Sequence, residues 1–395
     1  MTKFSIIGIL CLLMATISFG QNSEYEMKGN DKEVTADFLT SYYDQTGNNG
    51  AVTGGIGTED LQDYASMLVV NVPLDSINAI NVTVGADYYT SASTDNINSR
   101  VSSASSKDLR AYGTIGYTRK NLKKGTTYGV KANFSTEYDY TSISGGLSFA
   151  KEFNEGNSEL SLNAQAFFDN WEPFFPQELR GEVSVPTTER QSYNFQATYS
   201  QVINRRMQFS ISSEAILMKG LLSTPFHRVY FANQTLPDIE RLPDSRLKIP
   251  IGLRLNIFPA DAFVLRTYYR FYFDDWGLRA HSMSLEVPFK ISTGLTVSPF
   301  YRFHTQNQAD YFAPFAIHTT DEIFYTSDYD LSDLSSHKVG LGIKIAPLYG
   351  VGRTKVPFSK KVFTFKSIDV RGAYYQRSTG LNAFIVSLGL SFGMK

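Results

Sequence analysis

Large apolar residues alternate with small or polar residues along much of the chain. One such segment ends the sequence, where the alternating apolar positions are Phe384, Val386, Leu388, Leu390 and Phe392. The same period of two recurs over residues 128–134, 193–199, 247–257, 263–273 and 339–345. A period of two places successive side chains on opposite faces of a β-strand, so the pattern predicts an all-β protein.

The predicted strands are long for a soluble sheet. They run to about ten residues, whereas strands of globular proteins usually have about five or six. About ten residues is the span of a tilted transmembrane strand. The final strand also resembles the terminal strand by which outer-membrane proteins are recognised for insertion, although Phe392 is not the last residue. We therefore expect the strands to cross a membrane.

The connections between predicted strands alternate in length. Long connections cover residues 43–58, 91–107, 169–190, 219–246 and 305–335, and short turns cover residues 75–78, 121–125, 154–157, 204–206 and 259–262. Outer-membrane barrels have short periplasmic turns and longer extracellular loops. Residues 349–361 depart from this parity, because they form a longer connection on the turn side. The sequence predicts a single transmembrane antiparallel β-barrel over residues 33–395, with about 16 strands (14 to 18) and long extracellular loops.

The first residues have the features of an export signal. Lys3 precedes an apolar stretch over residues 4–14, and small residues follow at the expected cleavage position. We expect residues 1–20 to be a signal peptide and residues 21–32 to be a short periplasmic tail. The single cysteine, Cys11, lies within the signal, so we expect no disulfide in the mature chain.

The composition agrees with a barrel and excludes other classes. The 395 residues include 24 Tyr and 29 Phe, charged residues make up 19%, and the formal net charge is −1. A disordered chain lacks such aromatic content, and a mean hydropathy of −0.20 does not fit a helical membrane protein. A near-neutral chain also lacks the clustered excess of Lys and Arg that nucleic-acid binding requires. Many aromatic residues are expected on the lipid-facing surface.

Basic residues occur out of phase with the apolar ones in the second half of the chain, on the predicted lumen face. We call this set the basic wall; it consists of Lys248, Arg254, Arg266, Arg270, Arg302, Lys344 and Arg371. A one-sided basic wall attracts anions and biases conductance toward them. Alternatively, these cations pair with Glu214, Glu286 and Asp369 in a ladder that rigidifies the lumen. The sequence leaves both interpretations open.

Residues with catalytic chemistry are few. Asp274, Asp275 and His281 lie in a predicted hairpin at the outer rim, where two carboxylates and a histidine are able to activate water. The simpler interpretation is that the two acids and Gly277 form the turn while Trp276 lies in the interfacial aromatic belt. We therefore expect no enzymatic activity, with a rim hydrolase as a remote alternative.

Metal-binding and cofactor motifs are not evident. The five histidines match no metal motif, and we predict neither a metal site nor a cofactor. The segment 328–333 has the alternating acids of a calcium loop. It lacks the glycine and the distal Glu of an EF-hand, so we expect a solvated loop.

Three motifs resemble a known family. They are RFYFDDWG at residues 270–277 followed by His281, PFYRFHTQ at residues 299–306 with residues 309–312, and SDYDLS at residues 327–332. The motif residues that we single out are Asp274, Asp275, Trp276, Gly277, His281, Tyr301, Arg302 and Gln306. This stretch resembles an uncharacterised family of Gram-negative outer-membrane barrels, known as domain of unknown function three-five-seven-zero. The resemblance implies a barrel fold and no established activity.

The same resemblance implies a genomic association with exported flavin-attachment and thioredoxin-like proteins. It therefore suggests an exported redox protein as a partner. No flavin- or haem-attachment residue is visible in this sequence, so such a cofactor would belong to the partner.

Three functions remain as hypotheses. The first is a channel or transporter in the cell outer membrane for a small polar or anionic solute. The second is a non-conducting scaffold that anchors a surface or periplasmic redox partner through loops such as residues 171–176. The remote third is the rim hydrolase. We expect outer-membrane lipids and the outer-membrane assembly machinery as partners, and no nucleic acid.

Overall fold

The protein is built almost entirely from β-strands. A computed structural model describes residues 33–91, 107–357, 359 and 361–395, so the predicted signal peptide and periplasmic tail lie outside the described residues. Short 3-10 helices are η2 (Ala51–Thr53), η3 (Asn154–Gly156), η4 (Gln177–Leu179) and η5 (Tyr329–Leu331). No helix among the described residues has the length and apolar character needed to cross a membrane.

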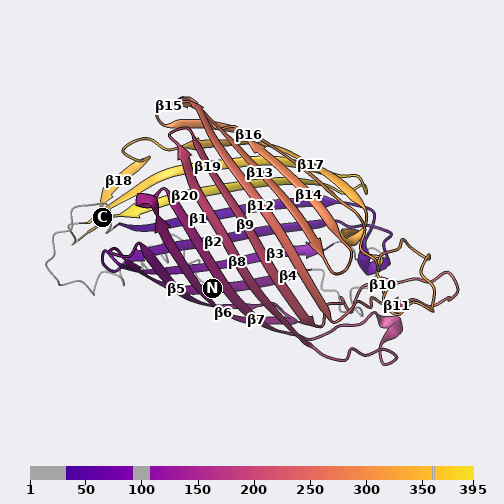
Figure 1. Ribbon diagram of the computed structural model, residues 1–395. Helices are drawn as coiled ribbons and strands as arrows, with labels where there is room; N and C mark the ends of the chain where they lie inside the picture. The colour runs from indigo at the N-terminus through magenta and orange to yellow at the C-terminus, as the bar shows by residue number, and fades with distance from the viewer. Residues whose placement is uncertain (1–32, 92–106, 358, 360) are drawn as a thin grey trace.

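Long antiparallel strands form the body of the molecule (Figure 1). The first nine are β1 (Val34–Thr46), β2 (Leu61–Pro73), β3 (Asn78–Ser91), β4 (Lys107–Asn121), β5 (Thr126–Thr136), β6 (Tyr140–Phe153), β7 (Ser158–Trp171), β8 (Glu189–Asn204) and β9 (Met207–Gly220). The others in the sheet are β12 (Ser245–Ala260), β13 (Phe263–Asp274), β14 (Arg279–Glu286), β15 (Phe289–Ser292), β16 (Leu295–Gln306), β17 (Leu334–Ile345), β18 (Gly352–Lys355), β19 (Val362–Arg377) and β20 (Asn382–Met394). Most of these strands are long enough to cross a bilayer at a tilt, as the alternation predicts.

The sheet closes on itself. Neighbouring strands along the chain pair antiparallel, and β1 pairs with β20 from Val34 opposite Met394 to Thr46 opposite Asn382. Of the eighteen strands in the sheet, β14 and β15 form one crossing, interrupted near Pro288, which has no N–H to donate to the ladder. Strand β18 pairs with β19 alone and belongs to the connection after β17. The described residues thus form a closed barrel of sixteen strands, which confirms the predicted fold class.

The two ends of the barrel differ in their connections, and most of the long ones lie at one end (Figure 1). One end, which we call the turn end, has the connections 74–77, 122–125, 154–157, 205–206, 261–262, 293–294 and 346–361. The other end, the loop end, has the long connections 47–60, 172–188, 221–244 and 307–333 and the short hairpins 137–139, 275–278 and 378–381. The connection 346–361 is longer than the other turns, as the sequence indicates.

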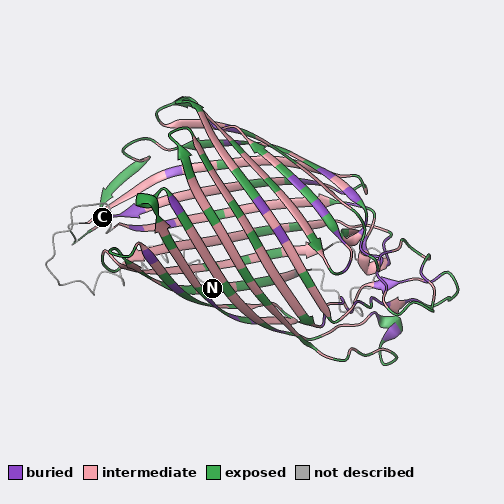
Figure 2. Ribbon diagram, in the orientation of Figure 1, coloured by how far each residue is buried: buried purple, intermediate pink, exposed green. Residues whose placement is uncertain are grey.

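The outer surface of the barrel is apolar. Aliphatic side chains are exposed near the middle of the strands, among them Ile115, Val130, Leu147 and Met283. Aromatic side chains are exposed nearer the strand ends, with Tyr117, Tyr128, Tyr199 and Phe289 toward the turn end and Tyr64, Tyr88, Phe168, Tyr193, Phe273 and Phe384 toward the loop end. More and less exposed positions alternate along the strands (Figure 2). An apolar band between two aromatic girdles is the surface that a bilayer covers in transmembrane barrels.

Three long connections pack together at the loop end. We call this assembly of residues 47–60, 221–244 and 307–333 the loop cap. Within its second connection, β10 (Arg228–Val229) pairs with β11 (Asp238–Ile239). Figure 1 shows this small sheet beyond the rim of the barrel.

Contacts between the connections give the loop cap a core of its own. Val229, Phe231 and Tyr325 are buried against one another, which joins the second connection to the third. The Nη1 atom of Arg228 donates to the carbonyl oxygen of Val52 at 2.7 Å, which adds the first connection. Segments that are far apart in the sequence are therefore fixed to one another at this end.

Candidate functional site

The second half of the barrel presents the basic wall to the lumen. Its seven residues lie on β12, β13, β16, β17 and β19. They alternate along these strands with outward-facing residues such as Leu253, Tyr269, Tyr301, Ile343 and Val370, which are exposed on the apolar surface. Because side chains alternate between the two faces of a strand, all seven cations belong to the inner face.

Glu286 on β14 neutralises part of the basic wall. The Nη2 atom of Arg371 donates to Glu286 Oε1 at 2.8 Å, and Arg266 Nη1 lies 3.6 Å from the same oxygen. Arg371 Nε also lies 3.4 Å from Asp369 Oδ1. Gly342 leaves room for the Arg371 side chain, because a Cβ there would lie 3.4 Å from its Cγ and Nε atoms. Part of the ladder that the sequence suggests is therefore present, at Glu286 and Asp369. It involves two of the seven cations, and among the described residues no cation lies within 4.0 Å of Glu214.

The other cations of the basic wall have no carboxylate oxygen within 4.0 Å in the part of the chain that the structure describes; they are Lys248, Arg254, Arg270, Arg302 and Lys344. The guanidinium of Arg254 lies over the ring of Tyr268 at 5.5 Å, and that of Arg270 lies over Tyr272 at 5.9 Å. An aromatic ring orients a cation without cancelling its charge. These positive charges therefore face the lumen directly.

The first nine strands form the opposite side of the lumen, which we call the polar wall. Its inner face carries mainly hydroxyl and amide side chains, including Ser142, Ser144, Gln165, Gln196, Thr198, Ser210 and Ser212. Arg110, a basic residue on this side, lies 3.8 Å from Asp87 Oδ2 and 3.6 Å from Glu137 Oε1. Lys131 also faces the lumen from β5 without a carboxylate oxygen within 4.0 Å among the described residues. Cations are therefore more numerous on the basic wall, whereas the polar wall combines neutral, acidic and a few basic groups.

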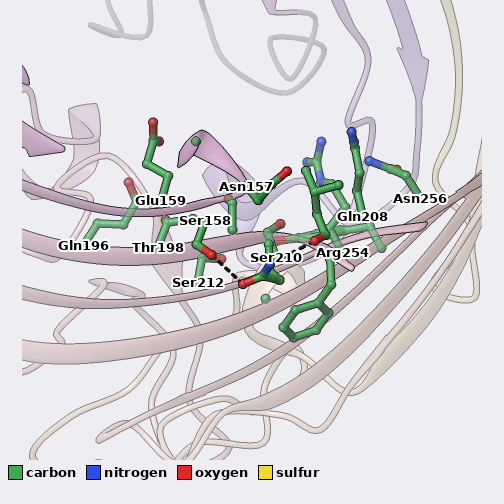
Figure 3. Close-up of a pocket in the computed structure, with 17 residues that line it drawn as sticks. Asn157, Ser158, Glu159, Gln196, Thr198, Gln208, Ser210, Ser212, Arg254 and Asn256 are labelled. Carbon is green, nitrogen blue, oxygen red and sulfur yellow. Dashed lines mark hydrogen bonds between the residues drawn. The ribbon is translucent and has the colours of Figure 1, made fainter. Parts of the chain in front are cut away.

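The two walls meet in a pocket of about 610 Å³ inside the barrel (Figure 3). Side chains of β7, β8 and β9 line it from the polar wall, and Arg254, Asn256 and Tyr268 line it from the basic wall. Among the lining residues, the Ser158 hydroxyl donates to Gln201 Oε1 at 2.6 Å. The pocket therefore combines the Arg254 guanidinium and the Glu159 carboxylate with neutral hydrogen-bonding groups.

The motif residue Asp274 holds the rim of the basic wall together. Its side chain is fully buried, and its Oδ2 atom accepts hydrogen bonds from Arg246 Nε at 2.9 Å and from the Tyr272 hydroxyl at 2.7 Å. Its Oδ1 atom accepts from the backbone N–H groups of Trp276 at 3.1 Å and Leu278 at 3.0 Å. This carboxylate therefore closes the β13–β14 hairpin, as the turn interpretation predicts.

Two neighbouring motif residues complete the hairpin. Gly277 has φ of 81°, and a Cβ there would lie 2.3 Å from Asp310 Oδ1, so only glycine fits without a shift of its neighbours. Trp276 is buried beneath the Arg246 guanidinium at 4.1 Å, and its Nε1 atom donates to the carbonyl oxygen of Ser245 at 3.0 Å. The expectation that Trp276 lies in the interfacial aromatic belt is wrong, because packing against the arginine and loop residues covers the indole.

The three residues of the hydrolase hypothesis are not brought together. Asp274 lies on the lumen side of the wall, whereas His281 lies on the outer face, with Nδ1 2.7 Å from the Tyr269 hydroxyl. Asp275 Oδ1 accepts from the backbone N–H of Leu247 at 2.9 Å. Since neither carboxylate faces the imidazole, this hairpin does not have the geometry of a general acid-base pair.

The remaining motif residues are distributed over three environments. Tyr301 faces outward, with its hydroxyl 2.7 Å from His337 Nδ1. Arg302 belongs to the basic wall. Gln306 Nε2 donates to the carbonyl oxygens of Asp330 at 2.9 Å and Ser332 at 2.8 Å, which anchors the connection 307–333. The motif residues therefore stabilise the fold of this part of the barrel and do not form a single site.

Two functionally placed residues were not singled out from the sequence. Arg246 lies in the same alternation phase as Lys248, so the pattern alone was sufficient to place it on the inner face. Arg377, whose Nη1 atom donates to Asp330 Oδ1 at 2.7 Å, ties β19 to the loop cap. No local signal identifies that contact, because its two residues are 47 positions apart. The expectation that the segment 328–333 is a solvated loop therefore holds only in part.

A closed antiparallel barrel of sixteen long strands, with an apolar exterior and a polar lumen, defines a transmembrane β-barrel protein. The chain belongs to the family described as protein of unknown function (DUF3570), whose sequence profile matches residues 83–384. The match extends far beyond the motifs in residues 270–332.

Comparison with solved structures gave matches at low sequence identity. A bacterial polysaccharide outer membrane secretin is 10% identical with a TM-score of 0.47, over 92% of this chain and 99% of that chain. The outer membrane protein OpdK from Pseudomonas aeruginosa is 6% identical with a TM-score of 0.40, over 91% and 98%. A Pseudomonas aeruginosa FadL homologue is 11% identical with a TM-score of 0.40, over 92% and 90%. Comparison with curated proteins gave no match.

Proposed function

We propose that this protein is an outer-membrane channel for small anionic solutes. The observation that carries the proposal is the set of cations on the basic wall without a carboxylate partner, Lys248, Arg254, Arg270, Arg302 and Lys344. A barrel of sixteen strands is wide enough for an aqueous lumen. Fixed cations on one wall of such a lumen raise the local concentration of anions and lower that of cations.

The two walls offer different contacts to a solute. The basic wall offers guanidinium and ammonium groups, which form charge-assisted hydrogen bonds with carboxylate, sulfate or phosphate oxygens. The polar wall offers hydroxyl and amide groups, which exchange hydrogen bonds with the hydration shell or the neutral parts of a solute. Because the charges are distributed along several strands, an anion meets successive weak sites and is able to leave.

Planar bilayers test this proposal. Purified mature protein is reconstituted, and the anion-to-cation permeability ratio is obtained from reversal potentials in a KCl gradient at low salt, where screening is weak. We expect anion selectivity in the wild type, and a ratio near one when Arg254→Gln, Arg270→Gln and Arg302→Gln are combined. The control combines Lys123→Gln, Lys124→Gln and Arg205→Gln, which removes the same charge at the turn end. Unchanged selectivity in the first triple variant, or a wild type without conductance, would reject the proposal.

Membrane location and assembly belong to the same proposal. The two aromatic girdles support contact with outer-membrane lipids. Phe392 lies on the outward face of β20 and stacks on Phe363 at 5.5 Å and on Phe365 at 5.1 Å. This terminal aromatic residue supports recognition by the outer-membrane assembly machinery. We expect Phe392→Ala to lower the amount of heat-modifiable barrel in the outer-membrane fraction, and normal amounts there would count against that role.

A second candidate function is a scaffold for an exported redox partner. It is favoured by apolar side chains exposed at the loop end, namely Tyr138 at 76%, Ile323 at 69% and Ile317 at 61%. Tyr138 also stacks on Phe174, within the segment named from the sequence, at 5.8 Å. This candidate predicts co-purification of an exported redox protein with a barrel that does not conduct. Robust conductance together with failure to recover such a partner would exclude it.

A further inference from the structure

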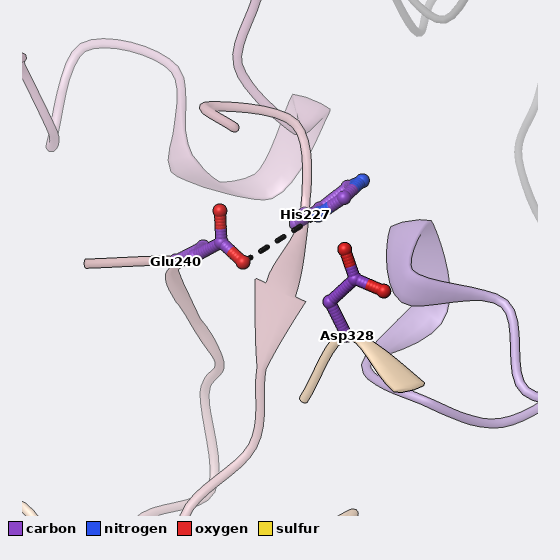
Figure 4. A group of neighbouring side chains, drawn as sticks. All are labelled: His227, Glu240 and Asp328. Atoms are coloured by element: carbon purple, nitrogen blue, oxygen red, sulfur yellow. Dashed lines mark ion pairs between the residues drawn. The ribbon is translucent and has the colours of Figure 1, made fainter. Parts of the chain in front are cut away.

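Three side chains with metal-ligand chemistry converge inside the loop cap (Figure 4). His227 precedes β10 and Glu240 follows β11, and the backbone N–H of Glu240 donates to the carbonyl oxygen of His227 at 2.9 Å. Asp328 comes from the other long connection and immediately precedes η5. The β10–β11 pairing therefore places two of the residues side by side, and the packing of the third connection brings the last one to them.

The distances between the donor atoms suit a shared ion. One ligand atom from each residue lies within 4.8 Å of the other two, and His227 Nδ1 lies 3.7 Å from Glu240 Oε1. Two atoms bound to the same zinc ion at about 2.0–2.2 Å each lie roughly 3–4 Å apart. The histidine and Glu240 already have this spacing, so a small movement of Asp328 is enough to complete the set.

The histidine nitrogen has no other partner. His227 Nδ1 is a buried atom without a hydrogen bond in the described part of the chain, and 16% of the side chain is exposed. A protonated imidazole normally donates at about 2.7–3.2 Å, and the gap of 3.7 Å to Glu240 is longer than that. The buried nitrogen thus lies near the Glu240 carboxylate without forming a hydrogen bond to it, and the Asp328 carboxylate belongs to the same cluster. An ion shared by the three residues would satisfy this arrangement.

Both carboxylates are held by groups outside the cluster. Glu240 Oε2 accepts from the backbone N–H of Thr224 at 2.6 Å, and its Oε1 atom accepts from the Thr326 hydroxyl at 2.5 Å. Asp328 Oδ1 accepts from the backbone N–H of Asp330 at 2.9 Å. Hydrogen bonds of this kind orient ligating carboxylates in metal sites.

The composition of the cluster also favours a cation. Two carboxylates, those of Glu240 and Asp328, converge on one imidazole. A divalent ion would compensate the negative charge of the two carboxylates.

We propose that His227, Glu240 and Asp328 bind a divalent transition-metal ion with the ligand preferences of Zn²⁺. One imidazole nitrogen and two carboxylate oxygens form a three-residue ligand set that leaves a position for water. Calcium prefers six to eight oxygen ligands and magnesium keeps an octahedral shell of water, so neither matches a set that includes nitrogen. The ion cross-links residues 221–244 to residues 307–333, and its role is to stabilise the loop cap.

Calorimetric titration tests the site in the mature barrel in detergent micelles. We expect ZnCl₂ to bind with a stoichiometry of one, and MgCl₂ and CaCl₂ to bind at least about 100-fold more weakly. Two separate variants, His227→Ala and Asp328→Asn, are expected to weaken zinc binding by about 100-fold. Asp321→Asn is the matched control, because it removes an exposed carboxylate from the same connection and is expected to bind zinc like the wild type.

Cobalt provides a spectroscopic readout. CoCl₂ bound to one imidazole and two carboxylates should give visible d–d absorption, which both ligand variants should lose. Heat-modifiable migration in gels shows whether each variant has kept its barrel, so loss of binding is separable from loss of fold. Absence of saturable zinc binding by the wild type, or wild-type affinity in both folded ligand variants, would overturn the proposal. Neither result depends on whether the barrel conducts.

Discussion

The two walls of the lumen have the same backbone and different chemistry. Strands β1 to β9 and strands β12 to β20 form one continuous antiparallel ladder, with apolar side chains outside. On the inside, the polar wall pairs Arg110 with Asp87 and Glu137, whereas the basic wall leaves five of its seven cations without a carboxylate partner among the described residues. Arg110 is therefore neutralised locally on the polar wall, whereas most cations of the basic wall are not.

The comparison shows that stability and function use different faces of the same strands. The backbone ladder and the lipid-facing residues stabilise the barrel wherever they occur, because each of the sixteen barrel strands is paired on both sides. Inner positions are free of this constraint, so their side chains set selectivity. The difference in charge between the two walls is thus the feature to which a solute in the lumen responds.

Charge reversal on the basic wall should have the largest effect. We expect Arg254→Glu combined with Arg270→Glu and Arg302→Glu to change an anion-selective lumen into a cation-selective one, because three fixed positive charges become negative. Reversal potentials in a KCl gradient measure the change. Continued anion selectivity would mean that these side chains do not line the conducting path.

Negative charges added to the polar wall test whether the position of a charge in the lumen matters. Ser144→Glu, Gln165→Glu and Gln196→Glu together add three negative charges, the same change that the triple Arg→Gln variant makes on the basic wall. Charges act mainly within about 8–10 Å in physiological salt, and the basic wall keeps its cations in this variant. We expect a smaller loss of anion selectivity than on the basic wall, and equal losses would show that the position of the charge does not matter.

The fold was predictable because a barrel repeats one simple pattern. A period of two shows which face of a strand is apolar. The pattern is contained within single strands, as in those between Leu247 and Phe392. The inward direction of the basic wall follows from the same phase. The sequence therefore predicted the closed topology and a count of about sixteen strands.

Contacts across the lumen rim were not predictable in the same way. The Arg246–Asp274 pair, the burial of Trp276 and the approach of His227 to Asp328 depend on how loops and neighbouring strands pack. A periodic pattern carries no information about such packing. The partial ladder at Glu286 has the same origin, because alternation gives the face of a charge and not its partner.

Each wall also has an ion pair at its rim, and the two should differ in importance. The Asp274 side chain on the basic wall is fully buried beside Arg246 and accepts five hydrogen bonds, so Asp274→Asn should lower the free energy of unfolding by about 3–5 kcal/mol. Asp169 on the polar wall pairs with Arg190 at 3.2 Å, and that arginine is more exposed. Asp169→Asn should cost about 1–2 kcal/mol. Urea unfolding in micelles measures both, and equal losses would contradict the difference between the rims.

Glu59 lies in the loop cap, within residues 47–60. Titration of its carboxyl group should make the free energy of unfolding depend on pH. Burial raises its pKa to about 7, and the nearby acid Asp330 adds to the increase while Arg377 opposes it. A carboxyl group whose folded pKa exceeds its unfolded value of 4.5 favours folding when protonated. Its contribution is therefore fully present below pH 4.5 and is lost as the pH rises to 7.

The variant Glu59→Gln removes this titration. We expect it to match the wild type near pH 4.5 and to be more stable above pH 7, by about 1 kcal/mol once partial exposure is taken into account. Urea midpoints at several pH values measure the difference. A variant with the same pH profile as the wild type would show that Glu59 is not the titrating group.

The smallest expected effect concerns Glu286, the acid that two cations of the basic wall share. Glu286→Gln leaves Arg266 and Arg371 without their shared carboxylate, so it should raise anion selectivity, by less than about twofold because the pair is partly solvated. Asp87→Asn is the matched change on the polar wall, where Arg110 keeps Glu137 at 3.6 Å. We expect Asp87→Asn to change the permeability ratio less than Glu286→Gln does. A larger effect of Asp87→Asn would mean that anions pass along the polar wall, and it would reverse the assignment of the two sides.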